Sequence, residues 1–378
     1  MINDIGVAVV GDVLDINTWS NTPWYFYHEG ARQGLFNQPW RLDMNKFSTS
    51  RKIWNATQML SGKGKGGYQY SESFLDKAEA MIKPSWFSST VISMNQVFPR
   101  ARKVTSSGGQ IYYYVDMTLA DLFAERSYNV NISETAKRKA LEIEKENYER
   151  AAGVVSMATW VHTSLKDFYK LPAGKIHAIM PGANLPLETV GVVPDMKDGA
   201  GITRNLRLGF IGKDWKRKGL LTLLDARDLL EQKGYKVNVI VIGPSPEELT
   251  GRRGVEFTGF IDKRSDHQKF IEVIRGCDVG CLFSESEALG ISVLEFLSVG
   301  VPVIGYAHQG TLDTLIPGAS VRFTLKDGAD TIAQRLSSII DNPPELRSLR
   351  ERARSAQENV TWKSTINQWA QLLNRRHE

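Results

Sequence analysis

Residues 281–306 read CLFSESEALGISVLEFLSVGVPVIGY, and this stretch places two glutamates beside a run that is otherwise apolar. Its apolar residues predict a strand, a helix and a second strand, at Val279–Phe283, Ile291–Val299 and Val301–Gly305. A helix between two buried strands is the unit from which parallel sheets are built. Burying a carboxylate without a partner is costly, so Glu287 and Glu295 are expected to have a specific function.

The same alternation of strands and helices continues on both sides of this stretch. Earlier in the second half, the sequence predicts strands at Arg207–Ile211, Val237–Ile242 and Val255–Thr258, and helices at Leu220–Lys233 and His267–Arg275. In the first half it predicts strands at Ile5–Val10, Ser89–Met94, Ile111–Val115, Val154–Ser156 and Ile176–Met180, and helices at Pro23–Gln33, Ser133–Ala152 and Thr163–Tyr169. Such alternation predicts mostly parallel sheets that are covered by helices on both faces.

The chain length predicts more than one domain. At 378 residues the chain is too long for one ordinary core, and it suits two domains of similar size. Residues 185–205, LPLETVGVVPDMKDGAGITRN, are rich in Pro and Gly and lack helical periodicity, so they predict a linker. We expect an N-terminal domain at 1–190, a second domain at 191–362 and a terminal helix at 363–378 that packs back on the first domain. The predicted fold class is α/β, with two doubly wound, Rossmann-like domains facing across a cleft.

The composition is that of a soluble globular protein, with 42% hydrophobic and 24% charged residues. No apolar run is long enough to cross a bilayer, and the start MINDIGVAVVGDV lacks the basic flank and long apolar region of a signal peptide. A cytoplasmic location is therefore expected. Cys277 and Cys281 are expected to be buried thiols rather than a disulfide or a metal site.

The charge pattern indicates whether the protein is expected to bind nucleic acid or a membrane. The net charge of +5 is modest, and no basic helix is interleaved with aromatic residues as a nucleic-acid platform requires, so we expect no nucleic-acid partner. The first half is rich in tryptophan and holds the basic clusters Gly62–Gly66 and Arg100–Lys103. Most of these rings are expected in the core, but a basic and aromatic rim would also suit peripheral association with a membrane.

Ligands of open parallel sheets bind beyond the carboxyl ends of the strands, so we expect the site in the loops that follow the strands. Glu287 lies in such a loop, and the free backbone N–H groups at the helix start near Ile291 favour an anion. Glu295, just over one turn into that helix, is placed to accept hydrogen bonds from the hydroxyls of a ligand. A ligand that is anionic at one end and rich in hydroxyls at the other is a sugar nucleotide.

A second loop, after Ile211, reads GKDWKRKG. Lys213 and Lys218 stand at the turn into the following helix, where both could reach one diphosphate; the alternative is a solvated basic turn. No Asp-x-Asp occurs at a strand end in the sequence, so nothing indicates a diphosphate held by a metal.

Together these residues resemble the retaining glycosyltransferases of family 4, which have the two-domain GT-B fold. The resemblance is strongest over Leu206–Phe323. There GKDWKRKG is similar to the family's Gly-Arg…Lys-Gly diphosphate loop, EALGISVLE to its Glu-x7-Glu motif, and VEFTGFID to its base-binding loop. In the first half, SMATWVHTSLKDFYKLPAGKIHAIMPGAN resembles the segment that ends the acceptor domain. A single Glu-x7-Glu is a weak signal, but all three motifs in order form a strong one.

The resemblance implies a role for each matching residue. Glu295 would hold the ribose, Glu287 would contact the transferred sugar, and Lys213 and Lys218 would stabilise the departing diphosphate. Gly11 would let the chain of the first domain pass close to that diphosphate. The other substrate contacts would be made largely by backbone, at Gly212, Phe260, Leu289, Gly290 and Ile291.

The chain departs from the family pattern in several places. The family's arginine is Lys213 here, which keeps the charge but loses the two-point grip of a guanidinium on phosphate. A glycine pair that often precedes the first helix is replaced by Ser20 and Asn21, and Thr22 is expected to cap that helix. The family's acceptor-side histidine has no clear match. Asp116 is our candidate for contacting the acceptor hydroxyl, and its alternative role is that of a helix cap.

The resemblance implies that a hexose is transferred from a nucleoside-diphosphate sugar to a saccharide or lipid-linked acceptor, in polysaccharide or glycoconjugate synthesis. A UDP-sugar is favoured over a GDP-sugar as the donor, and no cofactor or metal is implied. Two other classes stay open. A sugar-nucleotide epimerase on the same fold would need acid and base groups on both sides of the sugar carbon, whereas the loop offers one carboxylate, Glu287. A non-catalytic module that binds sugar nucleotides would have little use for the lysine pair.

Overall fold

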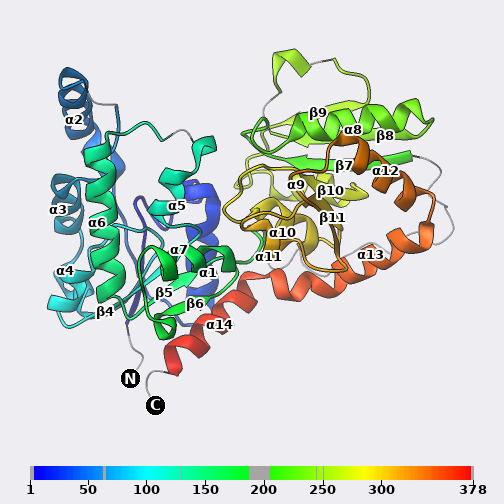
Figure 1. The fold of residues 1–378 in the computed structure, drawn as a ribbon. Coiled ribbons are helices and arrows are strands. Elements are labelled where there is room, and N and C mark those ends of the chain that lie inside the picture. The colour runs from blue at the N-terminus through cyan, green and yellow to red at the C-terminus, as the bar shows by residue number, and fades with distance from the viewer. Residues whose placement is uncertain are drawn as a thin grey trace. The chain divides into compact units, whose positions relative to one another are not determined.

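The chain divides into two compact units, which we describe separately (Figure 1). The computed structural model describes residues 4–62, 65–128, 130–186, 205–243, 245–249 and 251–375. The first unit comprises Met1–Met180 together with Thr365–Glu378, and the second comprises Pro181–Ser364. Most of the predicted linker, and the predicted domain boundary at residues 190 and 191, lie outside the described residues. Each unit holds a six-stranded parallel sheet between helices, so the prediction of two doubly wound, Rossmann-like domains is confirmed.

The sheet of the first unit has the strand order β2-β1-β3-β4-β5-β6. Its strands are β1 (Ile5–Ala8), β2 (Gln38–Pro39), β3 (Thr90–Ser93), β4 (Gln110–Val115), β5 (Gly153–Ser156) and β6 (Ile176–Ala178). Each neighbouring pair is parallel, with Gly6 opposite Val91 and Tyr113 opposite Val154. Parallel strands are covered on both faces, which explains why β4, QIYYYV, is almost continuously apolar instead of alternating.

Helices of unequal length cover this sheet. They are α1 (Thr22–Arg32), α2 (Ser48–Leu60), α3 (Glu72–Ala80), α4 (Ala101–Ser106), α5 (Leu119–Ala124), α6 (Glu134–Arg150), α7 (His162–Asp167) and the part of α14 (Trp362–Asn374) that follows Ser364. Ser71 and Ser133 cap α3 and α6 by accepting the N3 backbone N–H. The prediction that Thr22 caps the first helix is wrong, because α1 begins at Thr22 itself and its N-cap, Asn21, makes no side-chain cap bond.

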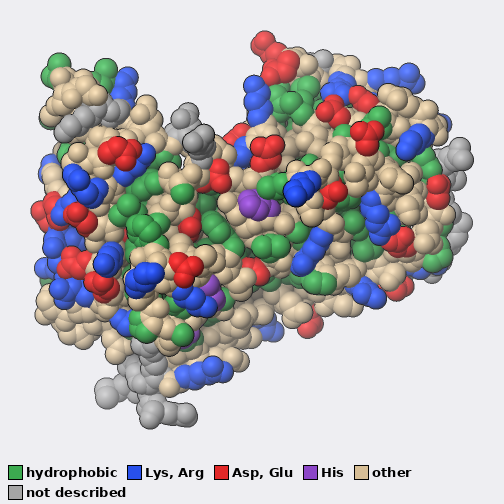
Figure 2. All heavy atoms as spheres, in the orientation of Figure 1, with side chains coloured by type: hydrophobic (Ala, Val, Ile, Leu, Met, Phe, Trp, Pro, Cys, Tyr) green, Lys and Arg blue, Asp and Glu red, His purple; other side chains and the backbone are tan. Residues whose placement is uncertain are grey.

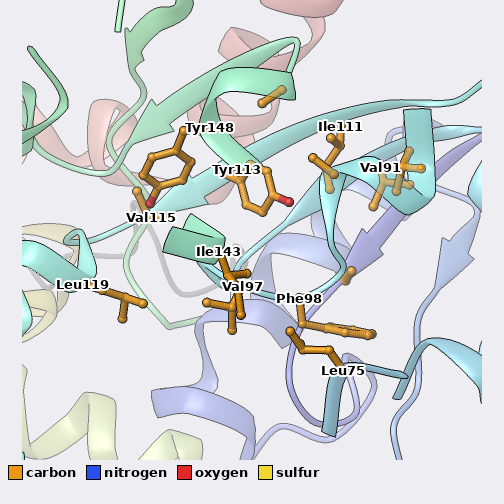
Figure 3. Close-up of a cluster of buried hydrophobic side chains, with 14 of the residues drawn as sticks. Leu75, Val91, Val97, Phe98, Ile111, Tyr113, Val115, Leu119, Ile143 and Tyr148 are labelled. Atoms are coloured by element: carbon orange, nitrogen blue, oxygen red, sulfur yellow. The ribbon is translucent and has the colours of Figure 1, made fainter. Parts of the chain in front are cut away.

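Aromatic side chains form much of the core of the first unit. Tyr113 of β4 and Tyr148 of α6 pack edge to face with ring centroids 5.5 Å apart, within the cluster drawn in Figure 3. Trp369 of α14 is fully buried and contacts the rings of Phe26, Tyr112 and Tyr114. This apolar face of α14 is therefore held in the core of the first unit.

Two buried ionisable side chains hold helices together in the first unit. Arg100 forms ion pairs with Glu72, Asp76 and Glu79, all on α3. Glu144 of α6 is fully buried; its carboxylate accepts hydrogen bonds from the N–H of Leu119 and from the hydroxyls of Tyr148 and Tyr169. Burial raises the pKa of Glu144 to about 8. Both groups link helices rather than line a strand end.

The sheet of the second unit has the order β12-β11-β10-β7-β8-β9. Its strands are β7 (Asn205–Ile211), β8 (Lys236–Ile242), β9 (Val255–Gly259), β10 (Val279–Leu282), β11 (Val303–Tyr306) and β12 (Ser320–Phe323). Its helices are α8 (Leu220–Gln232), α9 (His267–Arg275), α10 (Ile291–Ser298), α11 (Thr311–Thr314), α12 (Ala329–Ile340) and α13 (Pro343–Ala356). The strand order reverses between β7 and β10, which makes their carboxyl ends the topological switch point where ligands of such sheets bind.

Cys277 and Cys281 are free, buried thiols, as predicted. Across the described part of the chain, no helix combines the length and apolar character that crossing a membrane would require.

Candidate active site

The switch point of the second unit brings together the two loops that the sequence singled out. Residues 212–219 join β7 to α8, and residues 283–290 join β10 to α10. Gly219 has a φ of +75°, and a Cβ at this position would lie 2.1 Å from the carbonyl oxygen of Phe283. Only glycine combines this φ with so close an approach, so Gly219 lets the two loops contact each other.

A second pair of glycines sets the depth of α10. Gly209 of β7 and Gly280 of β10 lie opposite each other in the sheet. The ring of Phe296 packs over both, since a Cβ at either glycine would come within 2.7 Å of a ring atom. The missing side chains let α10 lie close to the sheet, and Glu295 is the neighbour of Phe296 on this helix.

Glu287 is paired with two cations from the neighbouring loop. Its Oε2 lies 3.5 Å from Nζ of Lys218 and 3.5 Å from Nη1 of Arg217. All three side chains are largely buried, and Arg217 also donates to the carbonyl oxygen of Ser286 at 2.5 Å. Opposite charges at this distance compensate for the desolvation of the carboxylate, which accounts for an acid beside an apolar helix.

Glu295 has a partner of its own. Its side chain is 3% exposed and forms an ion pair with Lys263, which follows β9. Lys263 also donates to the carbonyl oxygen of Asn184 at 3.4 Å, and its Nζ lies 4.3 Å from the ring centroid of Phe270. The Glu295 carboxylate, on the helix that follows β10, is thus paired with a cation from a third loop.

Lys213 lies over the ring of Phe260, with Nζ 4.5 Å from the ring centroid, and the Phe260 side chain is largely exposed. Gly212 accommodates the stem of Lys218, because a Cβ there would lie 2.5 Å from Lys218 Cδ. The structure therefore groups Gly212 and Lys218 with Glu287, and Lys213 with Phe260.

The start of α10 has the local structure that the sequence predicts. Gly290 is the N-cap residue with a φ of +83°, and Ile291 is the first helical residue. Leu289, which precedes these two residues in the chain, is buried, and its carbonyl oxygen accepts a hydrogen bond from the Thr314 hydroxyl. Gly290 offers no side chain to cap the helix. The N–H of Val293 donates to the Gly290 carbonyl oxygen at 2.9 Å, whereas the N–H groups of Ile291 and Ser292 at the helix start have no acceptor within the helix.

Gly11 and Asp116 lie in the first unit, after β1 and β4. Gly11 has a φ of +137°, which favours glycine. The alternative that Asp116 caps a helix is wrong, because Thr118 caps α5 in a capping box with Asp121.

The loop before α1 keeps a glycine-like backbone without glycines. Trp19, Ser20 and Asn21 have φ values of 39°, 55° and 72°. The Asn21 amide donates to the carbonyl oxygen of Ile16 at 2.5 Å and supports this path. Consecutive left-handed residues other than glycine are strained, and such strain is concentrated at functional loops.

Sequence reasoning missed Arg217, Lys263 and Gln309, which contact the two glutamates or their loop. Arg217 stands beside Lys218 in the basic loop, and Lys263 follows a strand end, so position alone could have indicated both. Gln309 carries no charge and belongs to no motif identified in the sequence.

Solved structures share this two-unit architecture over nearly the whole chain. Sucrose-phosphate synthase from Thermosynechococcus elongatus superposes with a TM-score of 0.65 and 17% identity, over 99% of this chain and 99% of that chain. HepE of Anabaena, in complex with UDP and glucose, superposes with a TM-score of 0.65 and 13% identity, over 99% and 100% of the two chains. The fold is therefore GT-B, that of two Rossmann-like domains.

Residues 196–356 match the model of the family described as Glycosyl transferases group 1. This segment, which is less than half of the chain, is therefore similar to the glycosyl transferases of group 1. The match agrees with the resemblance seen in the sequence, of which family 4 and the retaining mechanism stay predictions. A "Probable transglycosylase" of Burkholderia thailandensis is 27% identical over 196 residues, which are 51% of this chain and 51% of that one. A D-inositol 3-phosphate glycosyltransferase of Kribbella flavida is 25% identical over 216 residues, 53% of this chain and 51% of that one. The matched region thus spans about half the length of these curated relatives.

Proposed function

We propose that the protein is a retaining glycosyltransferase of family 4. It moves a hexose from a nucleoside-diphosphate sugar to a saccharide or lipid-linked acceptor, in polysaccharide or glycoconjugate synthesis. The observation that carries the proposal is the pairing of Glu287 with Lys218 and Arg217 at the switch point of a sheet in a group 1 glycosyl transferase segment. A UDP-sugar is favoured over a GDP-sugar because HepE, which has the same fold, binds UDP and glucose.

The reaction in this proposal needs charge stabilisation and positioning rather than a protein nucleophile. The bond between the sugar carbon and the diphosphate breaks, and negative charge develops on the leaving phosphate. Lys218 and the first backbone N–H groups of α10 stabilise that charge. The leaving phosphate takes the proton of the acceptor hydroxyl on the same face of the sugar, so configuration is retained. Glu287 orients the transferred sugar and Glu295 holds the ribose.

Metal-independent turnover is part of the proposal. Lys218 and Arg217 supply positive charge beside Glu287, and within the described ranges His, Cys, Asp and Glu side chains do not gather in threes as metal ligands. Turnover is expected to continue in excess EDTA. Loss of turnover in EDTA, with recovery on adding manganese, would contradict this part.

Peripheral association with the inner face of a membrane is a further part, and α2 supports it. Met44, Ile53, Met59 and Leu60 in and before this helix are exposed, Leu60 at 90%. The basic residues Lys46, Arg51 and Lys52 are exposed beside them, and Figure 2 shows hydrophobic and basic side chains together in this region. Exposed apolar and basic side chains on one helix suit the surface of an anionic bilayer.

Sedimentation with vesicles tests this part. The protein is expected to co-sediment with vesicles of phosphatidylglycerol and phosphatidylcholine, and less with phosphatidylcholine alone. The double variant I53E/L60E should lose this binding and keep its turnover of a soluble acceptor. Equal recovery in the supernatant with both kinds of vesicle would rule out the association.

Donor turnover tests the main proposal. Wild type, Lys218→Met and the control Lys216→Met, an exposed lysine of the same loop, are incubated with UDP- and GDP-hexoses with and without saccharide acceptors. Lys218→Met should lower kcat by about 10²–10³, the loss typical of one donor to a developing oxyanion, and Lys216→Met should be close to wild type. An epimerised sugar without acceptor would indicate an epimerase, and tight binding without turnover would indicate a binding module; either result would overturn the proposal.

A further inference from the structure

The loop that carries Glu287 is held by the loop after β11. The Oε1 of Gln309 accepts a hydrogen bond from the backbone N–H of Glu287 at 2.9 Å and from the Ser286 hydroxyl at 3.2 Å. The N–H of Gly310 donates to the carbonyl oxygen of Glu287 at 3.0 Å. Both polar groups of the Glu287 main chain are therefore bonded to two successive residues of one neighbouring loop.

The loop after β7 holds the same segment through Arg217. Its Nη1 donates to the carbonyl oxygen of Ser286 and lies 3.5 Å from Oε2 of Glu287, while its Nε donates to Asp214 at 3.2 Å. The Glu287 carboxylate is largely buried and lies 3.5 Å from Nζ of Lys218. Loops from β7 and β11 thus fix both the main chain and the side chain of this residue.

Gln309 adopts a conformation that its residue type disfavours. Its φ is +51°, in the left-handed region, which costs a residue with a Cβ about 1–2 kcal/mol. Gly310, the next residue, packs so tightly that a Cβ there would lie 2.0 Å from the carbonyl oxygen of Ala288. Glycine at position 309 would relieve the strain, but it would remove the amide that accepts from Glu287. The strain thus accompanies a contact that only a long polar side chain makes.

We propose that Gln309 is a positioning residue for Glu287. It fixes the Glu287 peptide so that the carboxylate, steadied by Arg217, faces the transferred sugar beside Lys218. This inference rests on the proposed function, in which Glu287 contacts that sugar and not the nucleoside diphosphate. Loss of the Gln309 amide should therefore lower kcat and leave affinity for the free nucleoside diphosphate unchanged.

Three substitutions at Gln309 separate the effect of losing its amide from the effect of relieving its backbone strain. Gln309→Met keeps the length and removes the acceptor, and we expect it to lower kcat about tenfold, with UDP affinity within about twofold of wild type. Gln309→Gly removes acceptor and strain together, so kcat should fall equally while Tm is higher than that of Gln309→Met. Gln309→Glu keeps acceptor oxygens for the Glu287 N–H and should recover part of kcat. Gln232→Met, at an exposed position at the end of α8, is the control.

Hydrogen exchange of the Glu287 amide tests the contact apart from turnover. Exchange should be faster in Gln309→Met and Gln309→Gly than in wild type and in Gln232→Met. Wild-type kcat in both variants would overturn the inference, as would a fall in UDP affinity parallel to kcat. If wild type turns over no donor, the proposed function fails. Exchange then tests the contact alone: unchanged exchange in the variants would overturn it, and faster exchange would support it.

Discussion

The two units have sheets of the same size and kind, yet they place their buried ionisable side chains differently. In the first unit, Arg100 and Glu144 lie among helices and join α3 to α4 and α5 to α6. In the second unit, Glu287 and Glu295 lie at the carboxyl end of the sheet, and each is paired with a cation from another loop. The same topology thus supports two arrangements of buried ionisable side chains. Arg100 and Glu144 join helices, whereas Glu287 and Glu295 lie where sheets of this kind bind ligands.

Replacing Arg100 should have the largest effect on stability. Arg100→Met leaves Glu79 buried without its cation, so we expect a loss of about 3–5 kcal/mol in the free energy of unfolding. Arg102→Met is the matched control, because Arg102 pairs with Glu72 while 45% exposed, and it should cost less than about 1 kcal/mol. Urea denaturation of both variants measures the difference. Similar losses would show that the burial of the Arg100 ion pairs adds nothing to their effect on stability.

Between about pH 4.5 and pH 8, Glu144 should make the stability fall as the pH rises. Burial raises its pKa from 4.5 to about 8, so the folded state binds the proton more tightly than the unfolded state does. Its contribution to stability is fully present below pH 4.5 and decreases as the pH rises to about 8. Glu144→Gln should therefore flatten the fall of Tm across this interval. A variant with the same slope as wild type would show that Glu144 does not titrate in this way.

The glutamates of the second unit should affect kinetics, and each differently. If Glu295 holds ribose, Glu295→Ala should weaken donor binding by about 1.5–3 kcal/mol and mainly raise KM, and Glu295→Gln should be milder because Lys263 keeps a partner. Glu287→Ala should lower kcat at least about tenfold with affinity for the nucleoside diphosphate nearly unchanged. Isothermal titration and initial rates on folded variants decide this. Identical or exchanged patterns would mean that the roles are assigned wrongly, and a loss of stability alone would make both glutamates structural.

The smallest effect is expected from relieving strain before α1. Ser20→Gly removes the Cβ from a residue with a φ of 55°, and it should raise stability by up to about 1 kcal/mol, less the entropy that glycine adds to the unfolded chain. Asn21→Gly should raise stability less, because it also loses the hydrogen bond from the Asn21 amide to the carbonyl oxygen of Ile16. Thermal denaturation compares the two. A clear destabilisation by Ser20→Gly would show that the serine side chain supports the loop.

Much of the fold was predictable because its signals are local. The sequence predicts α9 with its observed bounds and α10 within one residue, since apolar periodicity and a glycine mark these helices. The strand β2, with two residues, is too short to show a pattern. The candidate site was predictable only in part: Glu287, Glu295 and Lys218 stand in motifs, whereas Lys263 and Gln309 are separated from their partners by 32 and 22 residues. Such pairings arise from the strand order and are not visible along the chain.

The glycine pair under Phe296 has a consequence for engineering. Gly209 and Gly280 set the height of α10, and a methyl group on either would push the ring and its helix away from the sheet. Loops 212–219 and 283–290 follow these two strands. Their sequences could therefore change among relatives while the packing of Phe296 on Gly209 and Gly280 is kept. Under the proposed function, a library that varies the two loops and keeps Gly209, Gly280 and Phe296 would sample donor preference without shifting α10. Mutating the support would shift every residue of α10 at once.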